Sequence, residues 1–480
     1  MKEILESYSP LIQQYSIDKY FLDYTNMEKL LGDPKDIAVE ITVRIKNEGF
    51  TEYCKKFKKW GEYMTKRIIF HIDANSAYLS WEAVHRLQHG DPLDLRTVPS
   101  VVGGDPVTRH GIVLTKSIPA KKYGIVTGES IFNASAKCPE LIIVRPNYSL
   151  YVQCSKAFGD ILREYSPLVE QYSIDEYFVD FSNMERLYKD PVETAYSIKD
   201  RIRNTLGFSV NVGVSTNKIL AKMASELKKP DMVHTIFPEE MAEKMWVLPI
   251  EELFMVGRAT AKKLRSRAIN TIGDLAHSDP KIIKLFLHSH GLLVWNYANG
   301  IECSPVRENR RPLIKGIGNS TTIAFDVEDK KTAHLVLLSL TETVATRLRQ
   351  SGYCARLVSV SLRTNEFYNC SHQRKTNSAI DCTNAIHEVA CGLFDKLWKG
   401  QPVRHLGVRV SELCLDEFRQ LSLFEKDYEK QRTVDRTVDA IRERFGNGSV
   451  FRSSFLDSGV RFATGGTVDD EEYPMMSSIL

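Results

Sequence analysis

Apolar runs and helical stripes alternate along most of the chain, and the first clear unit begins after residue 66. The apolar run Ile68 to Ile72 predicts a buried strand that delivers Asp73 to its C-terminal end. Asn75 or Ser76 then fits a helix N-cap. The following helix carries an apolar stripe at helical spacing, formed by Ala77, Trp81, Val84 and Leu87. We therefore expect a carboxylate at a strand-to-helix junction.

Residues 88–140 are interrupted by glycine and proline and contain two short strand-like stretches, VPSVVGG and GIVLTKS, and a lysine-rich turn, AKKYG. This pattern is typical of a small inserted subdomain. Farther along, the pattern predicts a helix in DPVETAYSIKDRIRNTL and an alternating strand in SVNVGVS. A further helix opens at Asn217 and carries Lys218 and Lys222. The mixture of elements predicts an α+β fold with a mixed sheet.

The second half of the chain reads as a helical unit followed by another α+β domain. Residues 235–305 include FMVGRATAKKLRSRAINTIGDLA, two predicted helical segments joined by a tight Val256–Gly257 turn, which is the pattern of a helix-hairpin-helix. Residues 306–312 form an arginine- and proline-rich linker. In residues 313–415 three strands, TTIAFDV, LVSVSLRT and RHLGVRVSEL, alternate with two helices. The tail, residues 416–480, contains QLSLF, a charged helix and a polar end whose composition indicates disorder.

The chain contains one stretch twice. With a constant offset of 157, residues 4–47 match residues 161–204 at 25 of 44 positions. The copies differ at one decisive place, because Asp175 is followed by Glu176 whereas Asp18 is followed by Lys19. An ammonium repels a divalent cation, so only the downstream copy is expected to form a metal site.

Composition places few limits on function. A chain of 480 residues with 43% hydrophobic and 26% charged residues is expected to form about three globular domains. The net charge of +3 neither favours nor excludes a polyanionic partner, which would have to bind local basic faces. The nine cysteines contain no CxxC pair, so we expect neither disulfides nor a zinc site. No leader pattern and no apolar run of ~18 residues is found, which predicts a soluble, cytoplasmic protein without a membrane span.

The chemistry is expected at the Asp175–Glu176 pair. Neighbouring strand residues point to opposite faces, so both carboxylates can reach one site only from the tip of a hairpin between VEQYSI and YFVDF. With Asp73 they would offer oxygen ligands for two Mg²⁺ ions, a set suited to phosphoryl or nucleotidyl transfer. The dipeptide alone is weak evidence, since a solvated acidic turn would look the same.

Several motifs together resemble one family. HIDANSAY with Asp73, the AKKYG turn, SIDEYFVD, GVSTNKILAKMAS and VGRATAKKL occur in the order and spacing of the Y-family translesion DNA polymerases of the bacterial UmuC/DinB type. The resemblance runs from about residue 67 to residue 424. It implies a multi-domain right-hand polymerase in which Asp73, Asp175 and Glu176 are the catalytic, metal-binding acids.

The resemblance also implies domain boundaries. The palm would comprise residues 67–87 and 141–234, the fingers residues 88–140, the helix-hairpin-helix thumb residues 235–305, and an α/β little finger residues 313–415. Residues 1–66 would be a degenerate duplicate of palm segment 161–204 with a linker.

Four residues fall on nucleotide-binding positions of the family. Tyr78 corresponds to an aromatic steric gate that collides with a ribose 2′-hydroxyl, although an aromatic at helix spacing also fits a core position. The positions that contact the incoming triphosphate are Thr115, Lys121 and Lys222. The chain departs from the family at Ile118 and Lys121, where many members have Tyr and Arg, so one hydrogen bond and a bidentate guanidinium contact are lost. Many family members have an acidic residue at the position of Asn75, which is explained in this chain as a helix cap.

Other positions point to DNA and to a partner protein. Gly257 and Lys262 belong to the hairpin that would offer backbone N–H groups to a DNA phosphate. In the last domain a set of basic residues is expected against the duplex backbone: Lys315, Arg356, Arg363, Arg374, Lys375, Arg404 and Arg409. The run Gln420, Leu421, Ser422, Leu423 and Phe424 resembles the bacterial sliding-clamp pentapeptide. A peptide that packs back on its own domain is the alternative.

The resemblance implies a monomeric DNA polymerase that uses primer-template DNA, dNTPs and two Mg²⁺ ions to synthesise past damaged bases with low processivity. A non-catalytic DNA-repair adaptor that keeps the fold and the clamp peptide is the alternative from another class, and a two-metal nuclease or nucleotide cyclase is a third interpretation. The upstream copy is interpreted as a silent remnant of gene duplication, or as a segment that competes with residues 161–204 for the sheet.

Overall fold

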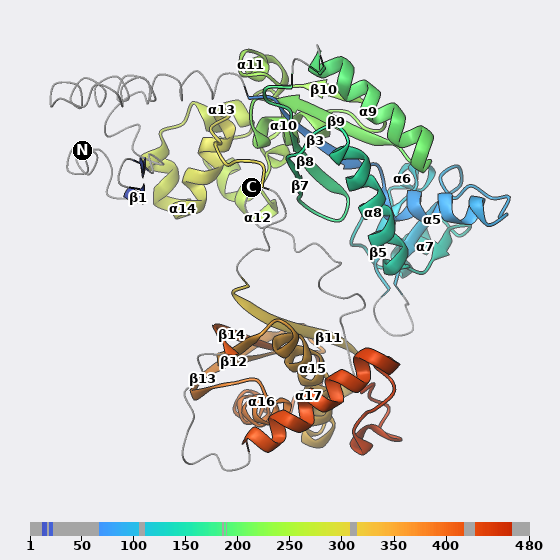
Figure 1. Ribbon diagram of the computed structural model, residues 1–480, viewed down its shortest axis with the longest axis vertical. Coiled ribbons are helices and arrows are strands. Elements are labelled where there is room, and N and C mark those ends of the chain that lie inside the picture. The colour runs from blue at the N-terminus through green and yellow to red at the C-terminus, as the bar shows by residue number, and fades with distance from the viewer. Residues whose placement is uncertain are drawn as a thin grey trace. The chain divides into compact units, whose positions relative to one another are not determined.

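The structure is a computed structural model that describes residues 67–104, 111–184, 187–188, 190–307, 314–416 and 428–462, and the backbone of residues 12–16 and 19–22. By contact the chain divides into two compact units, one with residues 1–75 and 155–309 and another with residues 76–154 and 310–475. Figure 1 shows the elements of each. In the part of the chain that is described, no helix is long and apolar enough to cross a membrane.

The first unit is built on a five-stranded sheet, which we call the central sheet (Figure 1). Its strand order is β10-β9-β3-β8-β7. β10 is parallel to β9, and the remaining neighbours are antiparallel. The strands are β3 (Ile69–Ala74), β7 (Val169–Gln171), β8 (Glu176–Asp180), β9 (Val210–Ser215) and β10 (Val233–Thr235). The apolar run predicted before Asp73 is therefore the middle strand, and it is fully buried.

Side chains of the central sheet alternate between two faces, each covered by helices. Phe158 of α8 (Tyr148–Arg163) packs edge-on against Tyr177 of β8, with ring centroids 4.9 Å apart. On the opposite face α10 (Lys218–Glu226) lies close to β9, because a Cβ on Gly213 would come within 1.9 Å of the Ala221 carbonyl oxygen. Glycine at position 213 thus permits the close approach that brings α10 onto the face that carries Asp73.

Local signals in the sequence explain where the helices on the sheet begin and end. α9 (Pro191–Leu206) starts with Asp190, whose side chain accepts a hydrogen bond from the Val192 amide, and ends at Gly207 with φ of 76°. α10 starts with Asn217, whose side chain accepts from the Leu220 amide at 2.9 Å. These are ordinary N-caps and a left-handed glycine C-cap. The predicted start at Asn217 is confirmed.

The chain that follows forms a helical unit, residues 236–301, that packs on α10. Its elements are η1 (Pro238–Glu240), α11 (Met241–Lys244), η2 (Ile250–Glu252), α12 (Arg258–Arg265), α13 (Ile272–Ala276) and α14 (Pro280–Ala298). One core joins the two, and it includes Ile219, Leu220, Met241, Ile250 and Leu264. The prediction that Val256–Gly257 joins two helices of FMVGRATAKKLRSRAINTIGDLA was wrong. The turn precedes α12, and residues 266–271 connect α12 to α13.

The first part of the second unit, residues 76–154, contains a three-stranded sheet of order β5-β4-β6. Its elements are α5 (Ala77–Gln88), β4 (Ser100–Gly103), β5 (Val113–Lys116), α6 (Ile118–Lys122), α7 (Ile131–Lys137) and β6 (Ile142–Val144). Two expectations need correction. The lysines of AKKYG end helix α6 rather than forming a turn, because Ser117 caps a helix there with its side chain. Ser76 does precede α5, but its side chain makes no cap hydrogen bond and its φ is 47°.

The rest of that unit, residues 314–462, is called the C-terminal unit. A four-stranded antiparallel sheet has the order β11-β14-β12-β13 and packs against α15 and α16. Its elements are β11 (Gly316–Val327), α15 (Lys330–Gln350), β12 (Tyr353–Thr364), β13 (Asn369–Ile380), α16 (Thr383–Leu397), β14 (Val403–Leu415), α17 (Tyr428–Phe445) and η4 (Ser453–Phe455). β13 was missed because NCSHQRKTNSAI is polar and mostly exposed.

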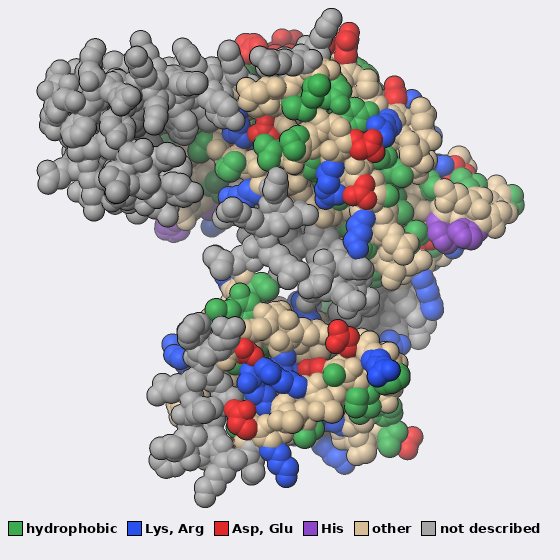
Figure 2. Space-filling model, in the orientation of Figure 1, with side chains coloured by type: hydrophobic (Ala, Val, Ile, Leu, Met, Phe, Trp, Pro, Cys, Tyr) green, Lys and Arg blue, Asp and Glu red, His purple; other side chains and the backbone are tan. Residues whose placement is uncertain are grey.

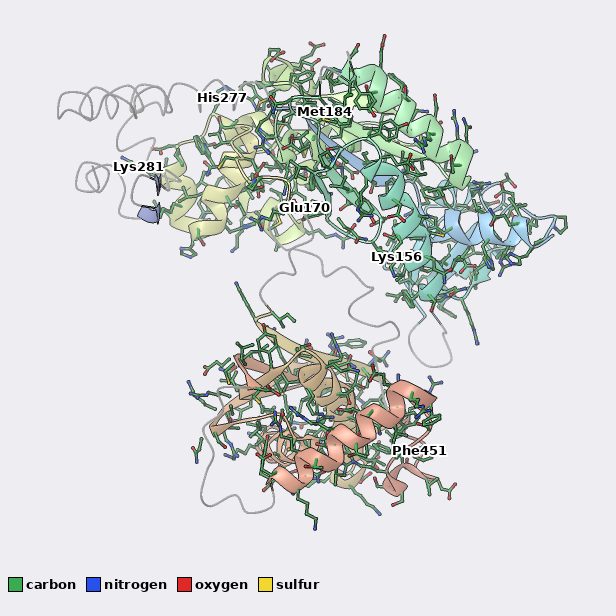
Figure 3. The ribbon with its side chains drawn as sticks, viewed as in Figure 1. Lys156, Glu170, Met184, His277, Lys281 and Phe451 are labelled. Carbon is green, nitrogen blue, oxygen red and sulfur yellow. The ribbon has the colours of Figure 1, made fainter. Side chains whose placement is uncertain are left out.

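The charged helix expected in the tail is confirmed as α17, and it docks on α15. Arg349 of α15 donates to Asp439 of α17 at 2.6 Å, and Arg442 of α17 donates to the buried Glu342 of α15 at 2.8 Å. Figure 2 shows basic and acidic side chains lying next to one another on this unit. Beyond the helix, Phe451, labelled in Figure 3, stacks on Phe462 with ring centroids 5.3 Å apart.

Candidate active site at the carboxylates of the central sheet

Three carboxylates meet at one end of the central sheet. Asp73 lies near the C-terminal end of β3, and its Cα is paired with that of Glu176, the first residue of β8. Paired residues share a face of a sheet, so both side chains point toward α10, which supplies Glu226. One oxygen from each of these three carboxylates lies within 4.8 Å of the others. The structure therefore brings Asp73 and Glu176 together as predicted and adds a third acid that was not predicted.

Asp175 lies in the turn before β8, at the hairpin tip where it was expected. Its carbonyl oxygen accepts a hydrogen bond from the Ala74 amide at 3.0 Å, which ties the turn to the end of β3. Its carboxylate accepts from the Ser173 hydroxyl at 2.6 Å, and the same hydroxyl lies 3.4 Å from a Glu176 oxygen. Ser173 thus fixes Asp175 next to Glu176, although Asp175 is not part of the three-carboxylate group.

Two lysines neutralise these acids. Lys229 donates to Asp73 at 2.6 Å and to Glu226 at 2.9 Å, and its side chain is 33% exposed. Lys222 donates to Glu176 at 2.6 Å, and its side chain is 9% exposed. Each carboxylate of the group therefore has an ammonium partner. Lys222, predicted as a triphosphate contact, lies beside Glu176, which was predicted as a metal ligand.

Burial dominates the electrostatics of Asp73. Desolvation raises the pKa of Asp73 to about 7, Lys229 opposes that shift, and the charges of Glu176, Glu226 and Asp175 add to it. Burial therefore disfavours the charged form of this carboxyl group, and the neighbouring carboxylates add to the effect. A bound cation would favour the charged form.

Beneath the carboxylates lies a buried histidine. The pKa of His71 is held well below its usual range by burial and, to a smaller extent, by the nearby Lys222 and Lys229 charges. His71 Nδ1 lies 2.7 Å from the Ser225 hydroxyl oxygen and His71 Nε2 lies 3.5 Å from Lys222 Nζ. A neutral imidazole therefore packs between β3 and α10 and does not add to the positive charge at the site.

The donor set fits a hard divalent cation. Asp73, Glu176 and Glu226 converge through carboxylate oxygens, with Asp175 beside them, and Mg²⁺ and similar ions take oxygen ligands in proteins. Glu226 and Lys229 were missed by the sequence reasoning. Glu226 lies four residues after Lys222 on α10, and that spacing would have placed both on one helix face. This spacing would identify Glu226 as a site residue only if α10 were already known to face Asp73.

The remaining nucleotide candidates lie in residues 76–154. Tyr78 is half-buried on α5 and stacks on Tyr151 of α8, with ring centroids 4.4 Å apart and planes inclined by 9°. Thr115 is half-buried on β5, and Lys121 is exposed on α6. The pKa of Lys116 is lowered by burial and by the charge of Lys121, so these two cations lie near each other.

The DNA-contact candidates divide between two units. Gly257 is the exposed N-cap residue of α12 and Lys262 is exposed on the same helix. Within the C-terminal unit, Arg363 of β12 is half-buried and donates to Asn369 at 2.7 Å. The strand register places Arg363, Lys375 and Arg409 on the open face of the sheet, as the pairs Arg363↔His405, Leu357↔Lys375 and Ser359↔Arg409 show. Strand alternation directs Arg374 to the other face, and Arg404 lies at a register shift between Val403 and His405.

Some expectations lie where the structure gives little or no description. Gln420, Leu421, Leu423 and Phe424 lie outside the described residues. For the upstream copy the backbone shows a hairpin of β1 (Ile12–Ser16) and β2 (Lys19–Leu22). Its pairs Ile12↔Leu22 and Gln14↔Tyr20 correspond at the offset of 157 to Val169↔Val179 and Gln171↔Tyr177 of β7 and β8. The two copies therefore form hairpins with the same register.

The chain resembles known proteins over most of its length. Family models described as the impB/mucB/samB family and its C-terminal domain match residues 1–53 with 72–226, and residues 314–423. The chain is 46% identical over 392 residues to DNA polymerase IV of Clostridium acetobutylicum, covering 82% of this chain and 98% of the relative. It is 36% identical over 400 residues to DNA polymerase IV 2 of Bacillus subtilis, covering 82% of this chain and 95% of that relative.

The fold has a solved counterpart. A Y-family DNA polymerase chimera aligns with a TM-score of 0.62 at 23% identity, over 72% of this chain and 99% of that one. This likeness shows the fold, and the sequence matches show the family. The chain belongs to the impB/mucB/samB family, that is, to the Y-family DNA polymerases.

Proposed function

We propose that the chain is a template-directed DNA polymerase that adds dNTPs to a primer 3′ end and extends past damaged template bases, with Asp73, Asp175 and Glu176 as its metal-binding acids. The observation that carries the proposal is the meeting of Asp73, Glu176 and Glu226 on one face of the central sheet, in a chain whose relatives are named DNA polymerase IV. We place this activity in the cytoplasm and expect a monomer.

The acids fit the two Mg²⁺ ions that the proposal includes. Y-family polymerases generally use divalent metal ions, which activate the attacking primer hydroxyl and stabilise the developing charge on the leaving phosphate. Asp73 and Glu176 face one another across paired strands, and Ser173 holds Asp175 beside them. Glu226 binds Lys229 at 2.9 Å and thereby positions its ammonium at the edge of the site.

Lys229 is the cation we assign to the triphosphate, in addition to the expected contacts of Thr115, Lys121 and Lys222. Its ammonium already lies 2.6 Å from Asp73 and its side chain is partly exposed, whereas the Lys222 side chain is nearly buried. Ammonium groups make strong charge-assisted hydrogen bonds to phosphate oxygens. Tyr78, five residues after Asp73 in the chain, is proposed as the gate against ribonucleotides.

Contacts with DNA and with a sliding clamp complete the proposal. The backbone amides that follow Gly257, with Lys262 on the same helix, are proposed to bind a template or primer phosphate. The open face of the C-terminal sheet, with Arg363, Lys375 and Arg409, is proposed to follow the duplex backbone through salt-sensitive contacts. The Gln420–Phe424 peptide is proposed to bind a sliding clamp, which would raise the local concentration on DNA.

The test is Mg²⁺-dependent primer extension on undamaged and abasic templates. The full chain is compared with the double substitution Asp175→Asn and Glu176→Gln, and with Asp160→Asn as a control on a carboxylate that is 73% exposed on α8. We expect extension by the wild type and by the control, and a loss of at least about a hundredfold in the double variant. Absence of extension by the wild type in the presence of primer-template and dNTPs would favour a non-catalytic DNA-repair adaptor instead.

A further inference from the structure

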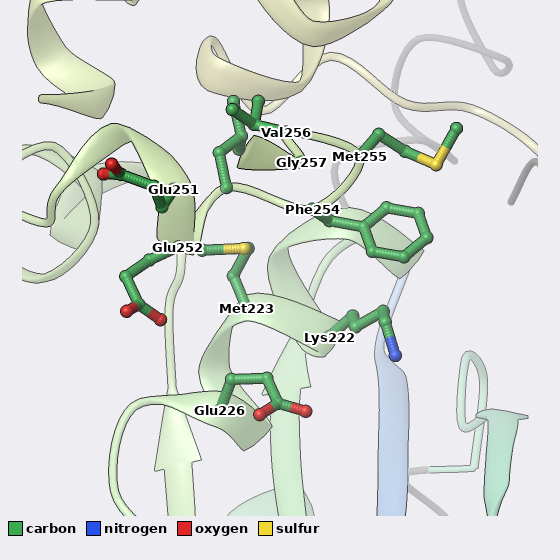
Figure 4. A pocket seen from close by; sticks show the side chains of 10 residues that line it. Lys222, Met223, Glu226, Glu251, Glu252, Phe254, Met255, Val256 and Gly257 are labelled. Carbon is green, nitrogen blue, oxygen red and sulfur yellow. The ribbon is translucent and has the colours of Figure 1, made fainter. Parts of the chain in front are cut away.

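Lys222 lies close to two aromatic rings in addition to its ion-pair partner Glu176. Its Nζ lies 5.2 Å from the centre of the Tyr172 ring and 5.3 Å from the centre of the Phe254 ring. The two rings are 6.4 Å apart and inclined by 68°, so they form two walls around the ammonium. We call this pair the aromatic cradle. Figure 4 shows the Lys222 amine beneath the Phe254 ring, at the edge of a pocket that Glu226 also lines.

The two walls come from different parts of the first unit. Tyr172 immediately precedes Ser173 in the hairpin, and its amide donates to the Glu176 carbonyl oxygen at 2.9 Å. Phe254 lies in the segment between η2 and α12, and its ring packs near Tyr297 of the helical unit. The cradle is therefore complete only when the helical unit is docked on the central sheet.

The Glu176 carboxylate can pair either with the Lys222 ammonium or with a bound divalent cation. Its Oε1 accepts a hydrogen bond from Lys222 at 2.6 Å, yet the same carboxylate belongs to the group that would hold a divalent cation. A buried ammonium that gives up its carboxylate is poorly solvated unless other groups stabilise it. Aromatic faces attract a cation through their negative π surface, and the attraction grows when the cation is desolvated.

We propose that the aromatic cradle stabilises the Lys222 ammonium when Glu176 exchanges the ion pair for a divalent cation, so that Tyr172 and Phe254 are positioning residues of the metal site. His71, whose Nε2 lies 3.5 Å from Lys222 Nζ, provides a further, polar neighbour. The inference rests on the proposed function only in assigning Glu176 to a metal site. It requires no DNA and no nucleotide.

The experiment measures Mn²⁺ binding directly, from the electron paramagnetic resonance signal of free Mn²⁺ in titrations of the full chain without DNA. Phe254→Leu removes the ring but keeps an apolar side chain, and we expect Mn²⁺ binding to weaken by about fivefold. Phe254→Tyr keeps the ring and should stay within about twofold of the wild type. Phe286→Leu is the matched control, since Phe286 is a partly buried ring of the same helical unit that stacks with Arg267.

A double-substitution cycle separates this role from a structural one. Lys222→Met removes a cation next to the carboxylates and should tighten Mn²⁺ binding several-fold, whereas a merely structural lysine would give weaker binding. In the Lys222→Met background, Phe254→Leu should have no further effect on Mn²⁺ affinity. An equal weakening in both backgrounds would overturn the proposal, as would an unchanged affinity in Phe254→Leu alone. Should circular dichroism show Phe254→Leu to be unfolded, Phe254→Met takes its place with the same expectation.

The same titration distinguishes this inference from the proposed function. Glu176→Gln must weaken Mn²⁺ binding if Glu176 is a ligand, whether or not the wild type extends a primer. A wild type that binds Mn²⁺ through Glu176 and shows the cycle described, but extends no primer, would support the cradle and contradict the polymerase assignment. If the wild type extends a primer and Phe254→Leu leaves the Mn²⁺ affinity unchanged, the polymerase assignment is supported and the cradle is contradicted.

Discussion

Lys229 forms a bridge between two of the acids in the site, which makes it the most informative single residue to change. Its ammonium contacts Asp73 at 2.6 Å and Glu226 at 2.9 Å. Lys229→Met would leave those carboxylates without a counter-ion and remove the partly exposed cation that we assign to the triphosphate. We expect kcat/KM for dNTP insertion to fall at least about tenfold, measured by single-nucleotide insertion kinetics.

The control for this prediction is the neighbouring residue. Lys228 is exposed, and Lys228→Met alters the net charge by the same amount as Lys229→Met. We expect the Lys228 variant to stay within about twofold of the wild type, because surface charges have small effects. Similar losses for both variants would show that general charge near the site matters and that the bridge does not.

A backbone feature of the helical unit gives a stability prediction. His288 is exposed within α14 and has φ of 55° and ψ of −139°, a region that is essentially restricted to glycine. His288→Gly should therefore raise the free energy of unfolding by about 1 kcal/mol, because the strain is relieved and little packing is lost. Denaturant unfolding measures the change. His290→Gly, a substitution within the regular helical part of α14, should instead lower stability by about 1 kcal/mol.

At the residue scale, the sequence predicted Asp73, Asp175, Glu176 and Lys222 but not Glu226 and Lys229. Asp175 and Glu176 stand out because they are adjacent at a hairpin tip and differ between two otherwise similar copies. Glu226 and Lys229 join the site only because α10 lies very close to β9 at Gly213, where a Cβ would meet the Ala221 carbonyl. The spacing of Lys222 and Glu226 shows that they share a helix face, but the sequence does not show that this face approaches Asp73.

Among the elements, α17 is held on the C-terminal unit by a buried tyrosine. The Tyr428 hydroxyl accepts a hydrogen bond from the Asp381 amide and donates one to the Asp381 carboxylate, both at 2.7 Å. Tyr428→Phe would remove the acceptor of the Asp381 amide and one donor to the Asp381 carboxylate, which keeps its contact with Arg432. We expect the local unfolding free energy of α17 to fall by about 1 to 2 kcal/mol. Hydrogen exchange of the α17 amides measures this loss.

The hydrogen-exchange experiment has a control on the same helix. Thr437→Ala removes an exposed hydroxyl from the same helix and should leave amide protection in α17 unchanged within about 0.5 kcal/mol. Unchanged protection in Tyr428→Phe as well would mean that the ion pairs of α17, among them Arg349–Asp439, Arg442–Glu342 and Arg432–Asp381, are enough to hold the helix in place.

The elements themselves were predicted unevenly, for a physical reason. β3 was found because a buried strand can be a nearly continuous run of apolar residues, and β9 because its apolar residues alternate. β13 was missed because it has one neighbour, β12, and exposes polar side chains over most of its length. The turn at Val256–Gly257 was found but assigned to the wrong junction, since turn residues identify a break between elements without showing which elements it separates.

At the scale of the whole molecule, the chain carries two hairpins with the same register, and only one of them is part of the central sheet. The β1–β2 hairpin forms a separate two-stranded sheet, whereas β7–β8 completes the central sheet next to β3. An isolated two-stranded hairpin is at best marginally stable in water. The downstream copy also carries the Glu176 that pairs with Asp73, whereas the upstream copy has Lys19 at that position. We therefore expect the upstream copy to be catalytically silent.

Deletion of residues 1–66 tests this expectation. Primer extension by the shortened chain should remain within about twofold of the full chain, because every acid and lysine assigned to the site follows residue 66. A large loss would show that the upstream segment supports the fold or the reaction. A several-fold gain would instead show that it competes for the place of β7–β8 beside β3, where Lys19 would bring an ammonium to the position of Glu176. Lys19→Glu in the full chain then decides the cause: it should restore activity if the charge inhibits, and should change nothing if displacement of the hairpin is enough.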